Sequence, residues 1–285
     1  LFEQAAELPN ALIGTVHSLG VKLLQRFAYE AGVSPDLQIM PDTDQQLIFN
    51  QSLATVLTEE KVNHIGHLSR QLGFYQQSQS EFDWRREVKT LIDIARVNDF
   101  SAEVLEASKK KSFETLAAYL PEPDTEFGNQ AADKLKQILQ VTLEELEAGA
   151  DDTKTTADAK NELKNTVREL EYSSELIWEK WVRLVKLKTG ARSRDAVQDL
   201  VDFAARHESH PQFHADIRDY IYAIFDVAID AIREYEDYKR KRGLIDYTDM
   251  EVKVRHLLAI PSVKAVLAEE IELLMVDEFQ DTSPI

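Results

Sequence analysis

The sequence predicts a mainly α-helical fold in which a large helical region lies between two short strands. Apolar residues recur at intervals of three and four through most of the chain, which is the spacing of helices with one buried face. Two short apolar runs near the ends, residues 11–16 and 273–276, instead favour strands. Acidic residues follow the second run directly, as is typical of a buried parallel strand that ends at a ligand-binding edge.

Helix starts and stops divide the first half of the helical region. The first predicted helix begins at Ser18, which we expect to be its N-cap, and ends at Gly32, which suits a left-handed C-terminal position. A short extended segment over residues 37–40 follows. The next predicted helices, each bounded by polar caps, proline or glycine, cover residues 41–57, 84–95, 101–120 and 135–148.

The second half contains the longest helical patterns. Residues 150–158 are acidic and rich in threonine, and they predict a mobile linker. The following predicted helices run to about residue 188, from 193 to 206, and from 211 to 242. The basic run 239–242 at the end of the longest helix suits the negative end of the helix dipole. Gly243 then stops this helix, and Asp246 is expected to cap the next one.

Composition limits the function. The net charge of −18 argues against a general nucleic-acid binder, because lysine and arginine dominate affinity for DNA phosphates, so any DNA contact has to be local. The absence of cysteine excludes disulfides and thiolate metal sites. No signal-peptide pattern and no membrane-spanning apolar run occurs, so we expect no membrane association and a cytoplasmic location.

A basic stretch in the second half is the best candidate for such a local contact. It carries Lys180, Arg183 and Lys186, with Trp178 and Trp181 interleaved. Basic and aromatic side chains together can bind nucleic-acid strands. Both tryptophans also fall at helical spacing and are expected in the core. DNA contact by the basic face and an ordinary solvated helix face therefore both stay open.

Three histidines, His207, His210 and His214, form a second local cluster. Three imidazoles could bind zinc, but Pro211 and the polar residues around it favour a loop. We therefore favour structural histidines over a metal site.

Two adjacent carboxylates, Asp277 and Glu278, follow the predicted strand at residues 273–276. Mg²⁺ prefers oxygen ligands and binds between a carboxylate and substrate phosphates. One acid can therefore hold the metal while the other orients water. A strand that simply ends in solvated acids would explain an isolated pair, but not the longer string that follows it.

Residues 277–281 read D-E-F-Q-D and resemble the D-E-x-Q-D motif of the UvrD/Rep family of superfamily-1 DNA helicases, which includes the RecB and AddA motor subunits. The resemblance implies that Asp277 binds Mg²⁺ and that Glu278 contacts the nucleotide as the general base that positions the attacking water. It also implies that Gln280 couples the nucleotide state to neighbouring motifs. The reaction would be phosphoryl transfer from ATP to water.

Two further strings resemble motifs of the same family. Residues 14–19, G-T-V-H-S-L, are similar to its G-T-F-H-S motif, which implies that Thr15, His17 and Ser18 contact single-stranded DNA. A structural role for the histidine is the alternative. Residues 243–250, G-L-I-D-Y-T-D-M, resemble its G-x-x-D-F-x-D-L signature. An ordinary joint of helix, glycine, cap and helix would give the same local spacing.

The resemblance implies a division into three parts. Residues 1–35 would belong to a P-loop (RecA-like) α/β ATPase domain, 36–243 to an all-helical insertion, and 244–285 to the return into that ATPase domain. No G-x-x-x-x-G-K-[ST] phosphate loop occurs in the chain, so it resembles an internal piece of the motor and is not expected to hydrolyse ATP by itself.

The long separation of the matches, about 260 positions between His17 and Asp277, favours the RecB- and AddA-like branch. That branch implies the motor subunit of an exonuclease V-like helicase–nuclease in DNA recombination and repair, which would bind single-stranded and duplex DNA and work with a partner subunit. The alternative is a non-catalytic helical interaction module that docks partner subunits. The motor interpretation expects residues 11–16 and 273–276 to be neighbouring parallel strands.

Overall fold

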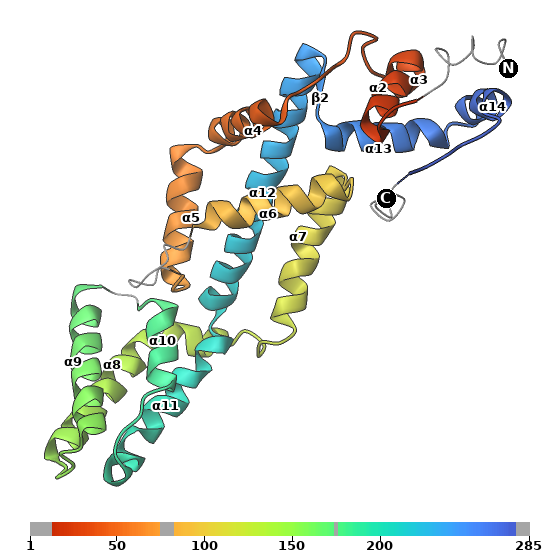
Figure 1. Cartoon of the computed structure of the whole chain (residues 1–285). Coiled ribbons are helices and arrows are strands. Elements are labelled where there is room, and N and C mark those ends of the chain that lie inside the picture. The colour runs from red at the N-terminus through yellow and green to blue at the C-terminus, as the bar shows by residue number, and fades with distance from the viewer. Residues whose placement is uncertain (1–12, 75–82, 174–175, 278–285) are drawn as a thin grey trace. The chain divides into compact units, whose positions relative to one another are not determined.

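The computed structural model describes residues 13–74, 83–173 and 176–277. These residues are mostly helical and include one two-stranded sheet (Figure 1). Among them, no helix has the length and apolar character needed to cross a bilayer. The elements in chain order are α2 (Val16–Arg26), α3 (Ala28–Ala31), β1 (Gln38–Ile39), α4 (Asp42–Val56), α5 (Glu59–Gln71), α6 (Trp84–Val97), α7 (Ala102–Ala117), α8 (Thr125–Ala148), α9 (Lys154–Tyr172), α10 (Trp178–Val185), the 3₁₀ turns η2 (Ala191–Ser193) and η3 (Asp195–Val197), α11 (Gln198–Ala205), η4 (Arg206–Ser209), α12 (Pro211–Arg242), β2 (Leu244–Ile245), α13 (Tyr247–Ala259) and α14 (Pro261–Glu270).

The chain divides into two compact units. Unit 1 comprises residues 1–57, 90–102 and 227–285, and unit 2 comprises residues 58–89 and 103–226. Helices α6 and α12 therefore contribute residues to both units. The three parts expected from the sequence are defined by their expected functions, whereas these two units are defined by compactness. The three-part division therefore stays a prediction.

Unit 1 contains the two short strands, which are parallel. Gln38 pairs with Leu244 and Ile39 pairs with Ile245. The ladder continues one residue further, because the amide of Met40 donates to the carbonyl of Ile245 at 2.8 Å. This pairing joins the segment after α3 to the segment after α12, although the two lie about 200 residues apart in the chain.

The glycines that end two helices in unit 1 have left-handed backbones. Gly32 has φ 63° after α3, and Gly243 has φ 65° after α12. Glycine adopts this conformation at little cost because it has no Cβ. Both predicted helix stops are confirmed. The core between these elements and the C-terminal helices consists of Leu24, Phe27, Leu37, Ile245, Met250, Leu257, Val263 and Leu267.

Unit 2 is a helical cluster in which α8 packs on α9 and on α11, and α11 packs on α10. Trp178 and Trp181 of α10 are buried, at 7% and 4% exposure, which confirms that they belong to the core. The indole of Trp178 also donates to the carboxylate of Asp216 at 2.7 Å, which satisfies its buried N–H. The tryptophans therefore stabilise the unit and do not offer stacking surfaces.

The two predicted terminal strands do not form within the described residues. Residues 13–15 are irregular and Val16 begins α2, while residues 11 and 12 lie outside the described ranges. Residues 273–276 are irregular too, and Leu273, Leu274 and Met275 are 73%, 75% and 83% exposed. A strand needs neighbours that pair with its backbone N–H and C=O groups, and the described sheet contains only β1 and β2. The expected parallel pair is therefore wrong for this structure, and the sheet forms elsewhere.

The segment predicted to be a mobile linker is ordered by hydrogen bonds. Asp151 is only 5% exposed, and its carboxylate accepts from the hydroxyls of Thr156 at 3.0 Å and Ser193 at 2.9 Å. The hydroxyl of Thr156 also accepts from the amide of Gly190 at 2.9 Å. Acidic and threonine-rich composition suggested solvation, but these side chains instead join the start of α9 to the η2 turn.

The long helix predicted to reach residue 188 is two helices. Helix α9 ends at Tyr172 and α10 begins at Trp178, with Ile177 in an extended conformation at the break. Apolar spacing continues on both sides of the break, so periodicity alone does not reveal it. The predicted helices from residue 41 and from residue 211 are confirmed as α4 and α12.

Candidate functional site

Two of the sequence motifs meet in unit 1, because α2 packs against α13 (Figure 1). The imidazole of His17 and the phenol ring of Tyr247 lie edge to face with their centroids 4.5 Å apart. One turn further along each helix, Gly20 faces Met250. A Cβ on Gly20 would lie 2.1 Å from the Met250 sulfur, so the absence of a side chain permits this close approach.

The aromatic pair is accessible to solvent. The side chain of His17 is 47% exposed, and Tyr247 is 37% exposed. The Nε2 atom of His17 lies 3.6 Å from a carboxylate oxygen of Glu251, which is one turn after Tyr247 on α13. An exposed ring pair of this kind offers flat apolar surface together with polar edges.

Thr15, and not Ser18, caps α2. The Thr15 hydroxyl oxygen accepts from the amide of Ser18 at 3.2 Å, while the Ser18 hydroxyl donates to the carbonyl of Thr15 at 2.9 Å. The predicted cap is therefore wrong by three residues, because a helix start is set by the residue whose backbone is extended, here Thr15. The Ser18 proton is committed to this turn, whereas the Thr15 hydroxyl acts as an acceptor and can still donate.

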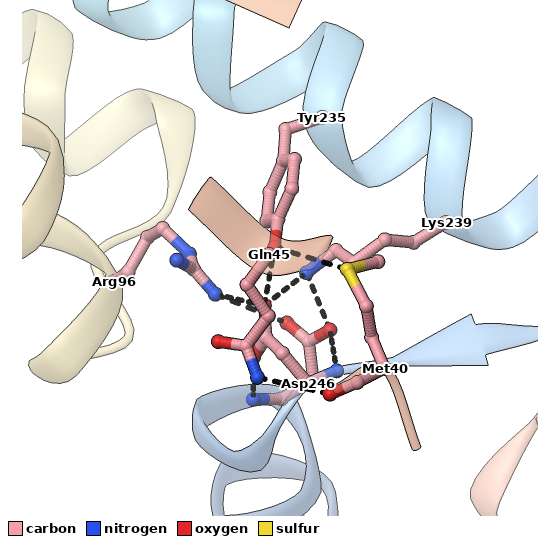
Figure 2. A network of polar contacts seen from close by, with 7 residues as sticks. Met40, Gln45, Arg96, Tyr235, Lys239 and Asp246 are labelled. Atoms are coloured by element: carbon pink, nitrogen blue, oxygen red, sulfur yellow. Dashed lines mark hydrogen bonds and ion pairs between the residues drawn. The ribbon is translucent and has the colours of Figure 1, made fainter. Parts of the chain in front are cut away.

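A buried polar cluster lies at the start of α13. Figure 2 shows Arg96, Tyr235 and Lys239 converging on Asp246, whose side chain is 1% exposed. One oxygen of the Asp246 carboxylate accepts from the Arg96 guanidinium, from the Tyr235 hydroxyl at 3.0 Å and from the Lys239 ammonium at 3.1 Å. These donors come from α6 and α12, so three separate chain segments meet at one carboxylate.

The other oxygen of Asp246 caps α13, as the sequence predicted. It accepts from the amide of Asp249 at 2.9 Å, and the Asp249 carboxylate accepts from the amide of Asp246 at 3.1 Å. The two residues therefore form a reciprocal capping box. The Asp249 carboxylate also accepts from Lys239, so the cap and the ion cluster share side chains.

Charge balance explains how this cluster stays ionised. Burial opposes the charge on Asp246, but the charges of Lys239 and Arg96 outweigh burial and hold the pKa of its carboxyl below the usual range. Burial and the Asp246 charge raise the pKa of the Tyr235 phenol, which therefore stays protonated and donates. Two cations and two carboxylates neutralise one another in this cluster.

Sequence analysis identified Asp246 as a cap but missed Arg96, Tyr235 and Lys239 as its partners. Tyr235 lies on the buried face of α12, and Lys239 follows it by one helical turn. A lysine one turn after a buried tyrosine is a signal for such a contact, although the basic run 239–242 by itself predicts only a complement to the helix dipole. Arg96 gave no comparable signal, because nothing local links α6 to residue 246.

The predicted magnesium site lies at the edge of the described residues. Asp277 follows the exposed segment 273–276, and a carboxylate suits Mg²⁺ by its chemistry. Glu278 and Gln280 lie outside the described ranges. Within those ranges, no group of three or more histidines and acids is arranged to hold a metal ion. The roles expected for these three residues stay predictions.

The basic stretch on α10 is largely paired with acids. The ammonium of Lys180 lies 2.9 Å from a carboxylate oxygen of Glu169, and Arg183 donates to Glu179 at 2.6 Å. Lys186 is exposed at the C-terminal end of the helix. This pairing reduces the positive charge that α10 can present to phosphates.

The histidine cluster of unit 2 makes backbone contacts. His207 Nδ1 lies 2.9 Å from the carbonyl of Ala204, and His214 Nε2 lies 2.8 Å from the carbonyl of Glu208. His210 Nδ1 accepts from the amide of Gln212 at 3.1 Å. One ring nitrogen of each histidine is therefore used locally, which is how structural histidines are satisfied.

Comparison with known proteins gives one family and a consistent set of relatives. The family model described as UvrD/REP helicase N-terminal domain matches residues 2–285. Several proteins whose names identify them as subunits of an ATP-dependent helicase/nuclease are similar to this chain. The one from Lactobacillus acidophilus is 22% identical and the alignment covers 100% of this chain and 27% of that protein. The one from Bacillus pumilus is 21% identical over 98% of this chain and 26% of that protein.

A third relative, from Latilactobacillus sakei, carries the same name and is 21% identical over 100% of this chain and 37% of its own length. The chain thus spans between 26% and 37% of the length of these relatives. A shorter match to the Streptococcus sanguinis protein of that name reaches 40% identity over 53 residues.

Proposed function

This chain belongs to the UvrD/REP helicase N-terminal domain family, and on that premise we propose that it forms part of an ATP-dependent DNA motor in which α2 and α13 bind single-stranded DNA. The observation that carries the proposal is the contact between His17 and Tyr247. These residues come from two motifs more than 200 positions apart, and both rings are exposed on one surface. Two family motifs that meet at one accessible surface are best explained by a shared ligand.

The chemistry of this surface suits a single strand. Each base has a flat face, and stacking on an aromatic side chain contributes about 1–3 kcal/mol per base. The amides at the start of α2 and the Thr15 hydroxyl suit phosphate oxygens. The carboxylate of Glu251, 3.6 Å from His17 Nε2, can orient the imidazole on this surface.

Nucleotide chemistry belongs to the C-terminal end of the chain in this proposal. Asp277 would hold Mg²⁺, Glu278 would position the attacking water as general base, and Gln280 would couple the nucleotide state to neighbouring motifs. When bound, Mg²⁺-ATP supplies the phosphoryl group whose transfer to water drives movement. In the intact protein, Glu278→Gln is expected to abolish DNA-dependent ATP hydrolysis and unwinding. Full motor activity in that variant would refute the assignment.

The relatives are named helicase/nuclease subunits. Their names support our proposal that this chain belongs to a helicase–nuclease that translocates on single-stranded DNA, separates duplex DNA and functions in recombination and repair, together with a partner subunit. The nuclease step is assigned to no residue of this chain.

The DNA-binding surface is tested by replacing Tyr247 with alanine in the intact protein. Loss of one stacking ring is expected to raise the Kd for a labelled single-stranded oligonucleotide about tenfold. Tyr29→Ala is the matched control, since Tyr29 is 96% exposed in the same unit and lies on α3, outside the ring pair. An unchanged Kd in Tyr247→Ala would exclude base stacking by this ring.

A second function is favoured for unit 2 alone. Lys180 and Arg183 are paired with acids, so α10 is a weaker candidate for phosphate binding, and unit 2 can instead act as a helical module that docks a partner subunit. Salt-dependent duplex binding that is lost in a Lys180, Arg183 and Lys186 triple glutamine variant would favour DNA contact. Unchanged duplex binding, with weaker association with the partner subunit, would favour the docking module.

A further inference from the structure

We propose that Arg96 and Lys239 are positioning residues for DNA binding, because through Asp246 they hold Tyr247 in its place beside His17. The inference rests on the proposed function of the surface formed by α2 and α13. It adds two residues that belong to no motif of the sequence and that do not themselves lie on this surface.

The Asp246 side chain is enclosed by protein. Its carboxylate and the Lys239 side chain are 1% and 3% exposed, and the Arg96 side chain is 19% exposed. Water therefore contributes little to the solvation of Asp246, and the charge depends on Arg96, Lys239 and the Tyr235 hydroxyl. Removal of one cation would leave the cluster with one more carboxylate than cations. This buried negative charge is relieved when Asp246 moves towards solvent or takes up a proton, and either change disturbs its contacts.

Asp246 also fixes the start of α13. Asp246 is the N-cap of the helix, and Tyr247 is the first helical residue after it. The same carboxylate that accepts from the cations also accepts from the amide of Asp249. A movement of Asp246 therefore changes the backbone of the first turn, and the Tyr247 ring cannot keep its 4.5 Å approach to His17 without that turn.

Helix α13 is not closely packed where it lines a cavity. A cavity of about 450 Å³ is lined along this helix by Thr248, Val252 and His256, which succeed one another by one turn. Arg96 and Lys239 line the same cavity. The side-chain packing that normally holds a helix in place is therefore incomplete along this part of α13. The ion cluster therefore restrains the first turn of α13, which lines the cavity and has room to shift when the cluster is broken. Further along the helix, Arg255 and His256 pair with Asp99.

Both cations also lie over the ring of Tyr235, Arg96 at 4.9 Å and Lys239 at 4.3 Å from its centroid. The tyrosine thus orients the two cations with its ring while its hydroxyl donates to Asp246. This arrangement limits each cation to a small range of positions, as expected of a group that positions another residue.

A double-mutant cycle in the intact protein tests the inference. Arg96→Met, Tyr247→Ala and the double variant are compared by the Kd for labelled oligothymidylate and by the DNA concentration that half-maximally stimulates ATP hydrolysis. Arg96→Met alone is expected to raise the Kd about three- to tenfold, and the double variant is expected to bind no more weakly than Tyr247→Ala. Such non-additivity shows that Arg96 acts through Tyr247, which a general loss of stability would not produce.

Controls separate this inference from the proposed function. Arg85→Met removes an exposed arginine from the same helix and is expected to leave the Kd unchanged. If Tyr247→Ala does not change the Kd, the proposed DNA-binding surface is wrong. If Tyr247→Ala weakens binding but Arg96→Met does not, or if the two losses multiply, positioning by Arg96 is refuted.

If Arg96→Met fails to fold, two conservative variants test the positioning role instead. Arg96→Lys keeps the charge, and Tyr235→Phe removes one hydrogen bond while keeping the ring beneath the cations. Each is expected to weaken DNA binding less than Tyr247→Ala does, and to add nothing to it in the double variant. Losses that multiply in both double variants would overturn the inference.

Discussion

Arg96 donates to the carboxylate of Asp246 across 150 positions of sequence. The arginine lies near the end of α6 and the aspartate at the start of α13, so this one contact joins two segments of unit 1 that share no local pattern. Because Asp246 also caps α13, the contact links the fold of the unit to the surface that carries Tyr247.

We expect Asp246→Asn to destabilise the chain strongly. The amide keeps the size of the side chain but leaves Arg96 and Lys239 with only the Asp249 carboxylate to balance their two charges. Removal of one partner from a buried ion cluster costs about 3–5 kcal/mol. Denaturant unfolding measures the change. Asp237→Asn is the matched control, because Asp237 is 43% exposed and pairs with exposed Arg240, and its loss is expected to cost less than about 1 kcal/mol. Equal effects of the two variants would contradict the importance of burial.

Tyr235→Phe removes only the hydroxyl that donates to Asp246. A hydrogen bond to a charged group contributes about 1.5–3 kcal/mol, so the free energy of unfolding is expected to fall by that amount. Tyr238→Phe, one turn along the same helix, is the control, since Tyr238 is only partly buried and its ring lies beneath Arg242. A loss of similar size in the control would show that the effect is not specific to the buried cluster.

Gly20→Ala is expected to separate α2 from α13. The new methyl group would meet the sulfur of Met250, which is 1% exposed and has little room to move. Overpacking of this kind costs about 1–3 kcal/mol. Gly66→Ala is the control, because a Cβ there meets nothing within 4 Å and alanine favours the helix. The unfolding free energy of the two variants should therefore change in opposite directions, and a stabilised Gly20→Ala would disprove the close contact.

The Asp151 cluster predicts a stability that depends on pH. Burial opposes its charge, but hydrogen bonds from Ser193, Thr153 and Thr156 outweigh burial and lower the pKa of Asp151 from 3.8 to about 2. A carboxyl with a lowered pKa in the folded state contributes stability above pH 3.8, and that contribution is lost as the pH falls towards 2. Asp151→Asn should therefore be less stable than wild type at about pH 5, and the gap should narrow between about pH 4 and pH 2, as followed by urea unfolding at each pH. Asp152→Asn, at the exposed neighbouring position, should show no such narrowing.

Much of the local structure followed from the sequence. Gly32 and Gly243 end their helices because glycine adopts a left-handed backbone at low cost, and Asp246 caps α13 because its side chain is short and accepts backbone amides. The buried tryptophans of α10 followed from helical spacing. These features depend on a few neighbouring residues, so a linear sequence is enough to predict them.

The motif strings also carried the family, since residues 2–285 match the UvrD/REP helicase N-terminal domain. The predicted terminal strands did not follow, because a strand depends on a neighbouring strand and the described sheet forms from residues 38–39 and 244–245 instead. The prediction of a mobile linker at residues 150–158 was wrong for a related reason. The residues that order it, Ser193 and Gly190, lie far along the chain.

The sequence by itself determined the glycine stops at Gly32 and Gly243, the Asp246 cap, the buried face of α10 and the family of this protein, because these follow from neighbouring residues and motifs. Only the tertiary structure decided that His17 meets Tyr247 and that Arg96 and Lys239 balance Asp246. Those contacts depend on how distant helices pack, and the charge of a buried carboxylate is stabilised by whichever cations the packing brings within reach.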